Sequence, residues 1–197
     1  MKTGIFGGSF NPVHNGHIHL AESIRDNLSL DRVIFVPSKI SPHKSSSEYV
    51  PEFHRLKMLE LAIQGKKSFE VSDYEIRCER ISYSIYTAEH FHKKYPSDEL
   101  YLLIGSDMLL SFDTWYRFRD IMSLVTLAVV SRNSGDFNLL SEKAVQLSQY
   151  GKIIISSVPP FPASSTEIRK KISKNQNYAC YLNENVVQYI TSNNLYK

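Results

Sequence analysis

The sequence predicts a doubly wound, Rossmann-like α/β fold with a parallel sheet in a single domain. Short apolar segments alternate with longer amphipathic segments along the 197 residues, as expected when helices cover a central sheet. Several short segments are almost continuously apolar, which is typical of strands buried on both faces. Hydrophobic residues make up 42% of the chain and charged residues 22%, a composition that excludes disorder for the bulk of the chain.

The expected elements can be placed one by one. Strands are predicted at residues 4–6, 33–36, 69–71, 100–104, 125–130 and 152–155. Helices are predicted at residues 17–28, 52–64, 84–95 and 139–150, and the apolar positions of the first recur at helical spacing. A further helix is predicted to begin near Ser164, so that a C-terminal helical part covers about 164–197. We find no repeat and no linker composition, which favours one domain over residues 1–197.

Charge and cysteine content narrow the class of protein. The net charge of +3, from 23 basic and 20 acidic residues, is too small to indicate a nucleic-acid or membrane partner. No run approaches the roughly 18 apolar residues of a membrane span, and the N-terminus lacks the apolar stretch of a signal peptide. Cys78 and Cys180 match no metal or redox spacing and are expected to be free thiols, with a disulfide as the alternative. We therefore expect a cytoplasmic enzyme or binding domain.

The loop after the first strand carries the strongest signal. It reads Gly7-Gly8-Ser9-Phe10-Asn11-Pro12-Val13-His14-Asn15-Gly16-His17 and leads into a helix. Paired glycines let the backbone approach a ligand closely, and a helix N-terminus offers free N–H groups to phosphate. If the stretch from His14 to His17 forms the first helical turn, both imidazoles face one side and can meet one anionic group. This combination predicts phosphate chemistry.

Other interpretations of this loop are weaker. A Gly-Gly turn alone indicates little, and a single histidine is usually a surface or a satisfied core residue. A zinc site would lack ligands, because no Cys, Asp or Glu stands near His14 and His17. A P-loop is excluded, since no GxxxxGK[ST] sequence occurs.

A second phosphate-binding element is predicted at the start of the C-terminal helix. Ser164 and Glu167 have the spacing of a capping box, which by itself indicates only a well-capped helix. Ser165 and Thr166 lie in the first turn, and Arg169 lies one turn further along the same helix. Their hydroxyl groups, free N–H groups and guanidinium form a suitable cradle for a polyphosphate.

These motifs resemble those of the nucleotidyltransferase superfamily with the HxGH motif. Residues 7–17 are similar to its first motif and residues 163–169 to its second, ISSTxxR, with Ala163 in place of isoleucine. Residues 37–44, 81–87, 103–107 and 112–116 resemble the PPHK, SYT, IGxD and WY segments of nicotinate-mononucleotide adenylyltransferases. Ser41 and Ser84 depart from those patterns, and the resemblance covers nearly the whole chain.

The resemblance implies a reaction in which ATP and nicotinate mononucleotide give nicotinate adenine dinucleotide and pyrophosphate, with Mg²⁺ arriving bound to ATP and no metal site of the protein's own. It implies His14, His17 and Arg169 as catalytic residues. The implied ATP contacts are Gly7, Gly8, Ser9, Phe10, His17, Gly105, Asp107, Arg132, Ser165, Thr166 and Arg169. The implied mononucleotide contacts are Lys39, His43, Lys44, Ser84, Trp115 and Tyr116.

Several of these residues also have plain structural interpretations. Trp115 and Tyr116 offer flat faces to a pyridine ring, but an aromatic pair after a strand is often core. Asp107 is suited to accept from a ribose hydroxyl or to cap a helix. Lys39 and Lys44 are either solvated charges or part of a lid.

The sequence leaves other functions open. A pantetheine-phosphate adenylyltransferase, a nicotinamide-preferring enzyme and a non-catalytic adenine-nucleotide sensor are the alternatives. A homo-oligomer also stays open, because Tyr178, Tyr181 and Tyr196 serve either a contact surface or the domain's own core.

Overall fold

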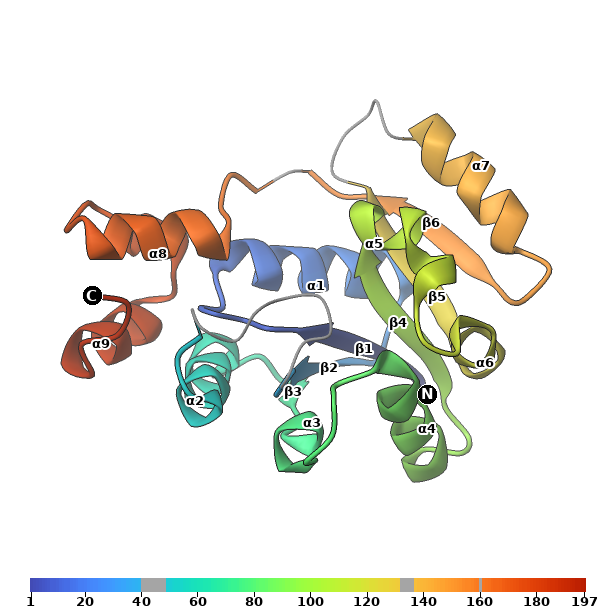
Figure 1. Ribbon diagram of the computed structural model, residues 1–197, viewed down its shortest axis with the longest axis horizontal. Coiled ribbons are helices and arrows are strands. Elements are labelled where there is room, and N and C mark those ends of the chain that lie inside the picture. Colours follow the sequence, from blue (N-terminus) through green and yellow to red (C-terminus); the bar gives the residue numbers. More distant parts are fainter. Residues whose placement is uncertain (40–48, 132–136, 160) are drawn as a thin grey trace.

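The computed structural model describes residues 1–39, 49–131, 137–159 and 161–197 and is built on a six-stranded, all-parallel sheet (Figure 1). The strands are β1 (Lys2–Gly8), β2 (Arg32–Pro37), β3 (Phe69–Val71), β4 (Glu99–Gly105), β5 (Thr126–Ser131) and β6 (Ile153–Ser157). They lie in the order β3-β2-β1-β4-β5-β6, which is the order of a doubly wound dinucleotide-binding sheet. The predicted fold class is therefore confirmed, and all six strands lie within two residues of their predicted bounds.

The helices were predicted less completely. They are α1 (Asn15–Leu28), α2 (Glu52–Ile63), α3 (Tyr74–Arg77), α4 (Ser84–Lys94), α5 (Ser106–Leu110), α6 (Phe118–Leu124), α7 (Phe137–Leu147), α8 (Ser165–Ser173) and α9 (Glu184–Ser192), with short 3₁₀ turns η2 (Phe112–Thr114) and η4 (Ala179–Tyr181). The four expected helices and the one that begins after Ser164 are present. The short α3, α5 and α6 were missed because fewer than two or three turns give no clear apolar periodicity.

Helices cover both faces of the sheet, and each face has its own core. One core joins the sheet to α1, α2, α8 and α9, and the other joins it to α4, α5, α6 and α7. Successive strand residues alternate between them, so that Ile5 faces the second core and Phe6 the first. Figure 1 shows α1 along one face of the sheet and α4 on the opposite face. Burial on both faces explains why the strands are almost continuously apolar.

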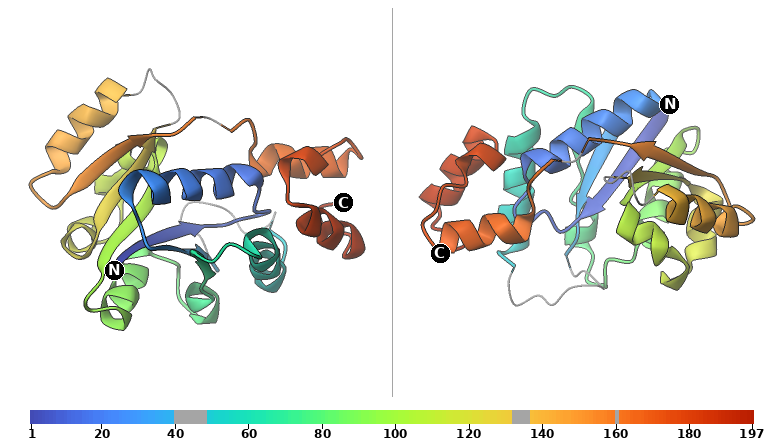
Figure 2. Two further views of the ribbon diagram at one scale, coloured as in Figure 1. Left: turned by 180° about the vertical axis from the view of Figure 1, so that it is seen from behind. Right: turned by 90° about the horizontal axis from the view of Figure 1, so that it is seen from above.

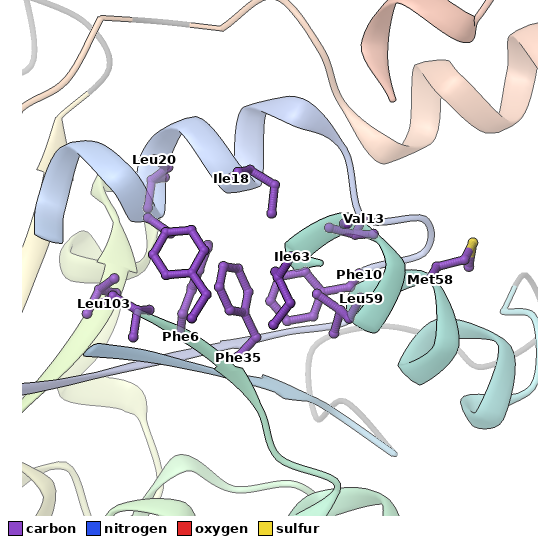
Figure 3. Close-up of a cluster of buried hydrophobic side chains, with 14 of the residues drawn as sticks. Phe6, Phe10, Val13, Ile18, Leu20, Phe35, Met58, Leu59, Ile63 and Leu103 are labelled. Atoms are coloured by element: carbon purple, nitrogen blue, oxygen red, sulfur yellow. The ribbon is translucent and has the colours of Figure 1, made fainter. Parts of the chain in front are cut away.

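Aromatic side chains fill the space between the sheet and α1. The ring of Phe6 lies 5.4 Å from Phe10 and 5.5 Å from Phe35, and all three are buried. In Figure 3 these rings lie between the sheet and the helix residues Ile18 and Leu20. Since Phe10 belongs to the loop after β1, this core fixes the base of that loop.

The topology predicts where a ligand binds. The chain winds from β1 outward to β3 and then returns across β1 to β4, so the order of strands reverses between these two neighbours. At such a switch point the loops after the two central strands diverge and leave a crevice at their carboxyl ends. The loop after β1 and the start of α5 after β4 border that crevice.

Two further findings concern the chain as a whole. None of the helices in the described ranges combines the length and the apolar character needed to cross a membrane. Both cysteines are free, with Cys78 half-buried and Cys180 exposed.

A glycine at the turn before β6 tests this packing. A Cβ added at Gly151 would collide with the backbone carbonyl oxygen of Met122, which cannot move without shifting α6. We expect Gly151→Ala to lower the free energy of unfolding by about 1–3 kcal/mol, as overpacking does. Thermal and urea unfolding would measure this change in the free energy of unfolding. Gly7→Ala is the matched control, because its Cβ meets nothing within 4 Å; equal stability of both variants would contradict the packing described.

Candidate functional site

The loop after β1 is fixed by side chains that donate to its carbonyl oxygens. Arg55 Nη1 donates to the Ser9 oxygen at 2.8 Å, and Arg169 Nη1 donates to the Asn11 oxygen at 2.9 Å. The Ser165 hydroxyl donates to the Pro12 oxygen at 2.9 Å. The donors come from α2 and from the first turns of α8, so two separate helices determine the course of one loop.

The end of the chain contacts the same loop. The Tyr196 hydroxyl donates to Asn11 Oδ1 at 2.9 Å, and the Val50 N–H donates to the same oxygen at 3.3 Å. Burial raises the pKa of the Tyr196 phenol, so the hydroxyl keeps its proton and acts as a donor. Asn11 is itself buried. The segment after α9 therefore helps to hold the loop.

The rings of the two histidines of the loop lie against each other. Helix α1 begins at Asn15, two residues earlier than predicted, and His14 is its N-cap. The ring centroids of His14 and His17 are 3.8 Å apart at an interplanar angle of 32°, which confirms that both rings face the same side. The His14 N–H donates to His17 Nδ1 at 3.2 Å. A neutral His17 ring therefore carries its proton on Nε2.

The histidine pair packs against Phe10 of the core and against the backbone at Gly16. The ring of Phe10, 1% exposed, lies 5.1 Å from the ring of His17. A Cβ on Gly16 would lie 3.0 Å from two atoms of the His14 ring and 3.2 Å from Phe161, so a larger residue there would press on the His14 ring. Phe10 was predicted to contact ATP; its side chain belongs to the core, which leaves only its backbone for a ligand.

The start of α8 meets the start of α1. Figures 1 and 2 show the two N-termini side by side, in agreement with the bonds from Ser165 and Arg169 to the loop. Ser164 caps α8 as predicted, because its Oγ accepts from the Glu167 N–H at 3.2 Å. Thr166 is exposed. Two positive helix ends and the Arg169 guanidinium converge here, an arrangement suited to an anion.

A cavity of about 220 Å³ lies at the carboxyl ends of β1, β2 and β4. It is lined by Phe6, Gly7, Gly8, Ser9, Ser38, Glu75, Ser82, Ser84, Leu102, Leu103, Ile104, Gly105, Met108 and Trp115. Six of these are predicted site residues, namely Gly7, Gly8, Ser9, Ser84, Gly105 and Trp115. The cavity therefore lies at the switch point of the sheet, where a ligand is expected.

Other predicted residues lie apart from this lining. Asp107 is exposed on the first turn of α5 and is not the cap of that helix, because Gly105 holds the N-cap position. Tyr116 is 49% exposed, and its ring packs 4.8 Å from Tyr83. Lys39 donates its N–H to Ser82 Oγ at 3.1 Å. His43, Lys44 and Arg132 lie outside the described residues.

The sequence did not reveal several residues of the site. Arg55 is 1% exposed although it stands in a helix whose sequence suggests an exposed cation. Ser38, Glu75, Ser82 and Met108 line the cavity. Ser38 and Ser82 lie within the motif-like segments 37–44 and 81–87, whereas no local pattern distinguishes Glu75 and Met108, because their role depends on contacts between distant segments. Among the described residues, no group of three or more His, Cys, Asp or Glu could hold a metal ion.

Comparisons with known proteins agree with this geometry. A family model described as cytidylyltransferase-like matches residues 5–171. A nicotinate-nucleotide adenylyltransferase of Bacillus subtilis is 33% identical over 196 residues, covering 100% of this chain and 98% of that protein. A probable nicotinate-nucleotide adenylyltransferase of Clostridium novyi is 37% identical over 198 residues, covering 100% and 99%.

A solved structure shares the fold. The Plasmodium falciparum nicotinic acid mononucleotide adenylyltransferase, solved in complex with NaAD, has a TM-score of 0.81 at 19% identity. The match covers 100% of this chain and 98% of that one.

The hydrogen bond between His14 and His17 predicts which nitrogen of His17 carries the proton in solution. Because Nδ1 of His17 accepts the His14 N–H, we expect neutral His17 to be the Nε2–H tautomer. Nitrogen-15 NMR of the imidazole side chains would show a protonated Nε2 and an unprotonated Nδ1, with the exposed His92 as the reference. A His17 ring protonated on Nδ1 would contradict the geometry.

Proposed function

The chain belongs to the cytidylyltransferase-like family, and we propose that it transfers the adenylyl group of ATP to nicotinate mononucleotide, forming nicotinate adenine dinucleotide and pyrophosphate. The two bacterial relatives described above carry this activity in their names and match over the full chain. The observation that carries the proposal is the pair of adjacent rings of His14 and His17 at the start of α1, beside the start of α8.

The chemistry needs positioning and charge neutralisation more than proton transfer. The nucleophile is a 5′-phosphate oxygen of the mononucleotide, which is ionised at neutral pH. It attacks the α-phosphorus of ATP, and the bond from that phosphorus to the oxygen bridging to the β-phosphate breaks, so that pyrophosphate leaves with the electron pair. No general base is required, and catalysis rests on alignment and on stabilising the charge of the transition state.

The histidines and the two helix ends supply that stabilisation. We assign His17 Nε2–H, with His14, to the α-phosphate oxygens, together with the backbone of Gly7, Gly8, Ser9 and Phe10. One N–H of Arg169 is committed to the Asn11 carbonyl, and its other donors are assigned to the β- and γ-phosphates. The first turn of α8, with Ser165 and Thr166, contributes its free N–H groups.

The remaining substrate contacts are assigned from the residues that line the cavity and from the family resemblance. Ser84 and Trp115 line the cavity and are assigned to the mononucleotide. Tyr116, Lys39, His43 and Lys44 are assigned to the same substrate. Gly105, Asp107 and Arg132 are assigned to ATP. Mg²⁺ enters as the MgATP complex, as part of the substrate.

Three further expectations remain proposals. Residues 1–197 form one nucleotidyltransferase domain, which is supported by the core that α8 and α9 share with the sheet. Tyr178, Tyr181 and Tyr196 pack against that same core, which favours their role within the domain; the homo-oligomer stays a prediction. The cytoplasmic location likewise stays a prediction.

A single assay tests the reaction. The protein is mixed with MgATP and, separately, with nicotinate mononucleotide, nicotinamide mononucleotide or pantetheine phosphate, and pyrophosphate release is followed. We expect the fastest release with nicotinate mononucleotide. Faster release with another acceptor would reassign the substrate, and no release with any of the three would favour a nucleotide-binding module.

His17→Ala should lower kcat by about 10²–10³-fold, the range for losing one preorganised donor. The KM for ATP should change far less, because the contact strengthens mainly in the transition state. Steady-state kinetics would measure both, with His92→Ala, an exposed histidine on α4, as the control. Turnover close to that of the wild type would remove His17 from the mechanism.

Arg169→Ala should weaken both ATP binding and turnover, since the phosphates are charged throughout and the Asn11 carbonyl also loses its donor. Nucleotide titration and kinetics would detect the two effects, with the exposed Arg119→Ala as the control. An unchanged affinity for ATP would disprove the assignment.

A further inference from the structure

A buried carboxyl group lies at the wall of the cavity, and the reaction proposed above does not use it. Glu75, on α3, is 7% exposed and is the only ionisable side chain among the described residues that line the cavity. Burial raises the pKa of its carboxyl, while hydrogen bonds from Thr87 and Ser82 act in the opposite direction. A buried carboxyl with hydroxyl partners costs folding stability, and such costs are concentrated at functional sites.

The contacts of this carboxyl join three segments of the chain. Glu75 Oε1 accepts a hydrogen bond from Thr87 Oγ1, in the first turns of α4, at 2.5 Å. The Ser82 hydroxyl, just before α4, lies beside the same carboxyl and lowers its pKa. Ser82 Oγ in turn accepts from the Lys39 N–H at 3.1 Å. The carboxyl therefore connects α3, the start of α4 and the segment that follows β2.

The residue before Lys39 faces the cavity with a hydroxyl available to a ligand. Ser38 is 8% exposed, and its N–H donates to the Gly8 carbonyl at 2.9 Å. Its Oγ is buried and has no hydrogen-bond partner within the described part of the chain. Buried hydroxyls are normally bonded, so this one is suited to a substrate atom. Its position depends on Gly8 on one side and on Lys39, Ser82 and Glu75 on the other.

We propose that Glu75 is a positioning residue for the acceptor substrate: through Ser82 and Thr87 it holds Ser38 and Lys39 after β2, and the start of α4, in the geometry that binds the mononucleotide. The inference rests on the proposed function, because Ser84 and Trp115 of the same cavity are assigned to that substrate. The β- and γ-phosphates of ATP are assigned to the other side, at the start of α8.

The Glu75→Gln variant distinguishes an effect on substrate binding from an effect on the stability of the fold. The glutamine amide oxygen can still accept from Thr87, but its NH₂ group faces the Ser82 hydroxyl, which then loses its acceptor. Because burial raises the pKa of the Glu75 carboxyl, its ionisation at neutral pH opposes folding, and removing the charge offsets the loss of an interaction with Ser82. A residue with a merely structural role would instead lower the unfolding temperature when its hydrogen bonds are broken.

The experiment compares Glu75→Gln with the wild type at pH 7.5. We expect the KM for nicotinate mononucleotide to rise about tenfold, the effect of one charge-assisted hydrogen bond, with the KM for ATP within about twofold. The unfolding temperature should stay equal or rise. Amide hydrogen exchange at Lys39 should become faster, because its acceptor Ser82 Oγ turns away. Glu70→Gln, the same change on a glutamate 47% exposed on β3, should alter neither KM.

A second pair of variants covers the case in which Glu75→Gln fails to fold. Thr87→Val removes the hydroxyl at nearly constant volume and should raise the KM for the mononucleotide, whereas Thr87→Ser should restore it. An unchanged KM for the mononucleotide in Glu75→Gln, or equal rises in both KM values with a lower unfolding temperature, would overturn the proposal. A wild type that does not use nicotinate mononucleotide would refute the proposed function, and Lys39 exchange would then decide the positioning role alone.

Discussion

The candidate site depends on how the carbonyl oxygens of one loop are satisfied. Arg55, Ser165 and Arg169 donate to the oxygens of Ser9, Pro12 and Asn11, and thereby turn these acceptors toward the protein. A phosphate is repelled by outward carbonyl oxygens and attracted by N–H groups. The three donors therefore give the loop the electrostatic character that an anionic substrate requires. They also couple α2 and α8 to the position of the histidines on α1.

The sheet and the histidine pair were predictable because their signals are local. Strands buried on both faces have short apolar sequences, and residues three apart at a helix start share one side. The structure adds a detail: α1 begins at Asn15, because the His17 ring accepts the N–H of His14 and closes the first turn there. The capping of α8 by Ser164 was predictable for the same reason.

Contacts between distant segments could not be predicted. Arg55 lies 46 residues from Ser9, and Arg169 lies 158 residues from Asn11, so no spacing rule connects them. Phe10 stands inside the motif, yet its side chain supports the ring of His17 within the core. The cavity likewise combines the ends of three strands with α3 and the start of α4, and only the folded chain brings Ser38 and Glu75 to it.

We propose that the histidine pair and the start of α8 bind the two ends of one triphosphate. A crystal structure of the protein with a non-hydrolysable ATP analogue tests this most directly. We expect the α-phosphate within hydrogen-bond distance of His17 Nε2, and the β- and γ-phosphates against Arg169 and the first turn of α8. Phosphates bound elsewhere, with neither group in contact, would contradict it.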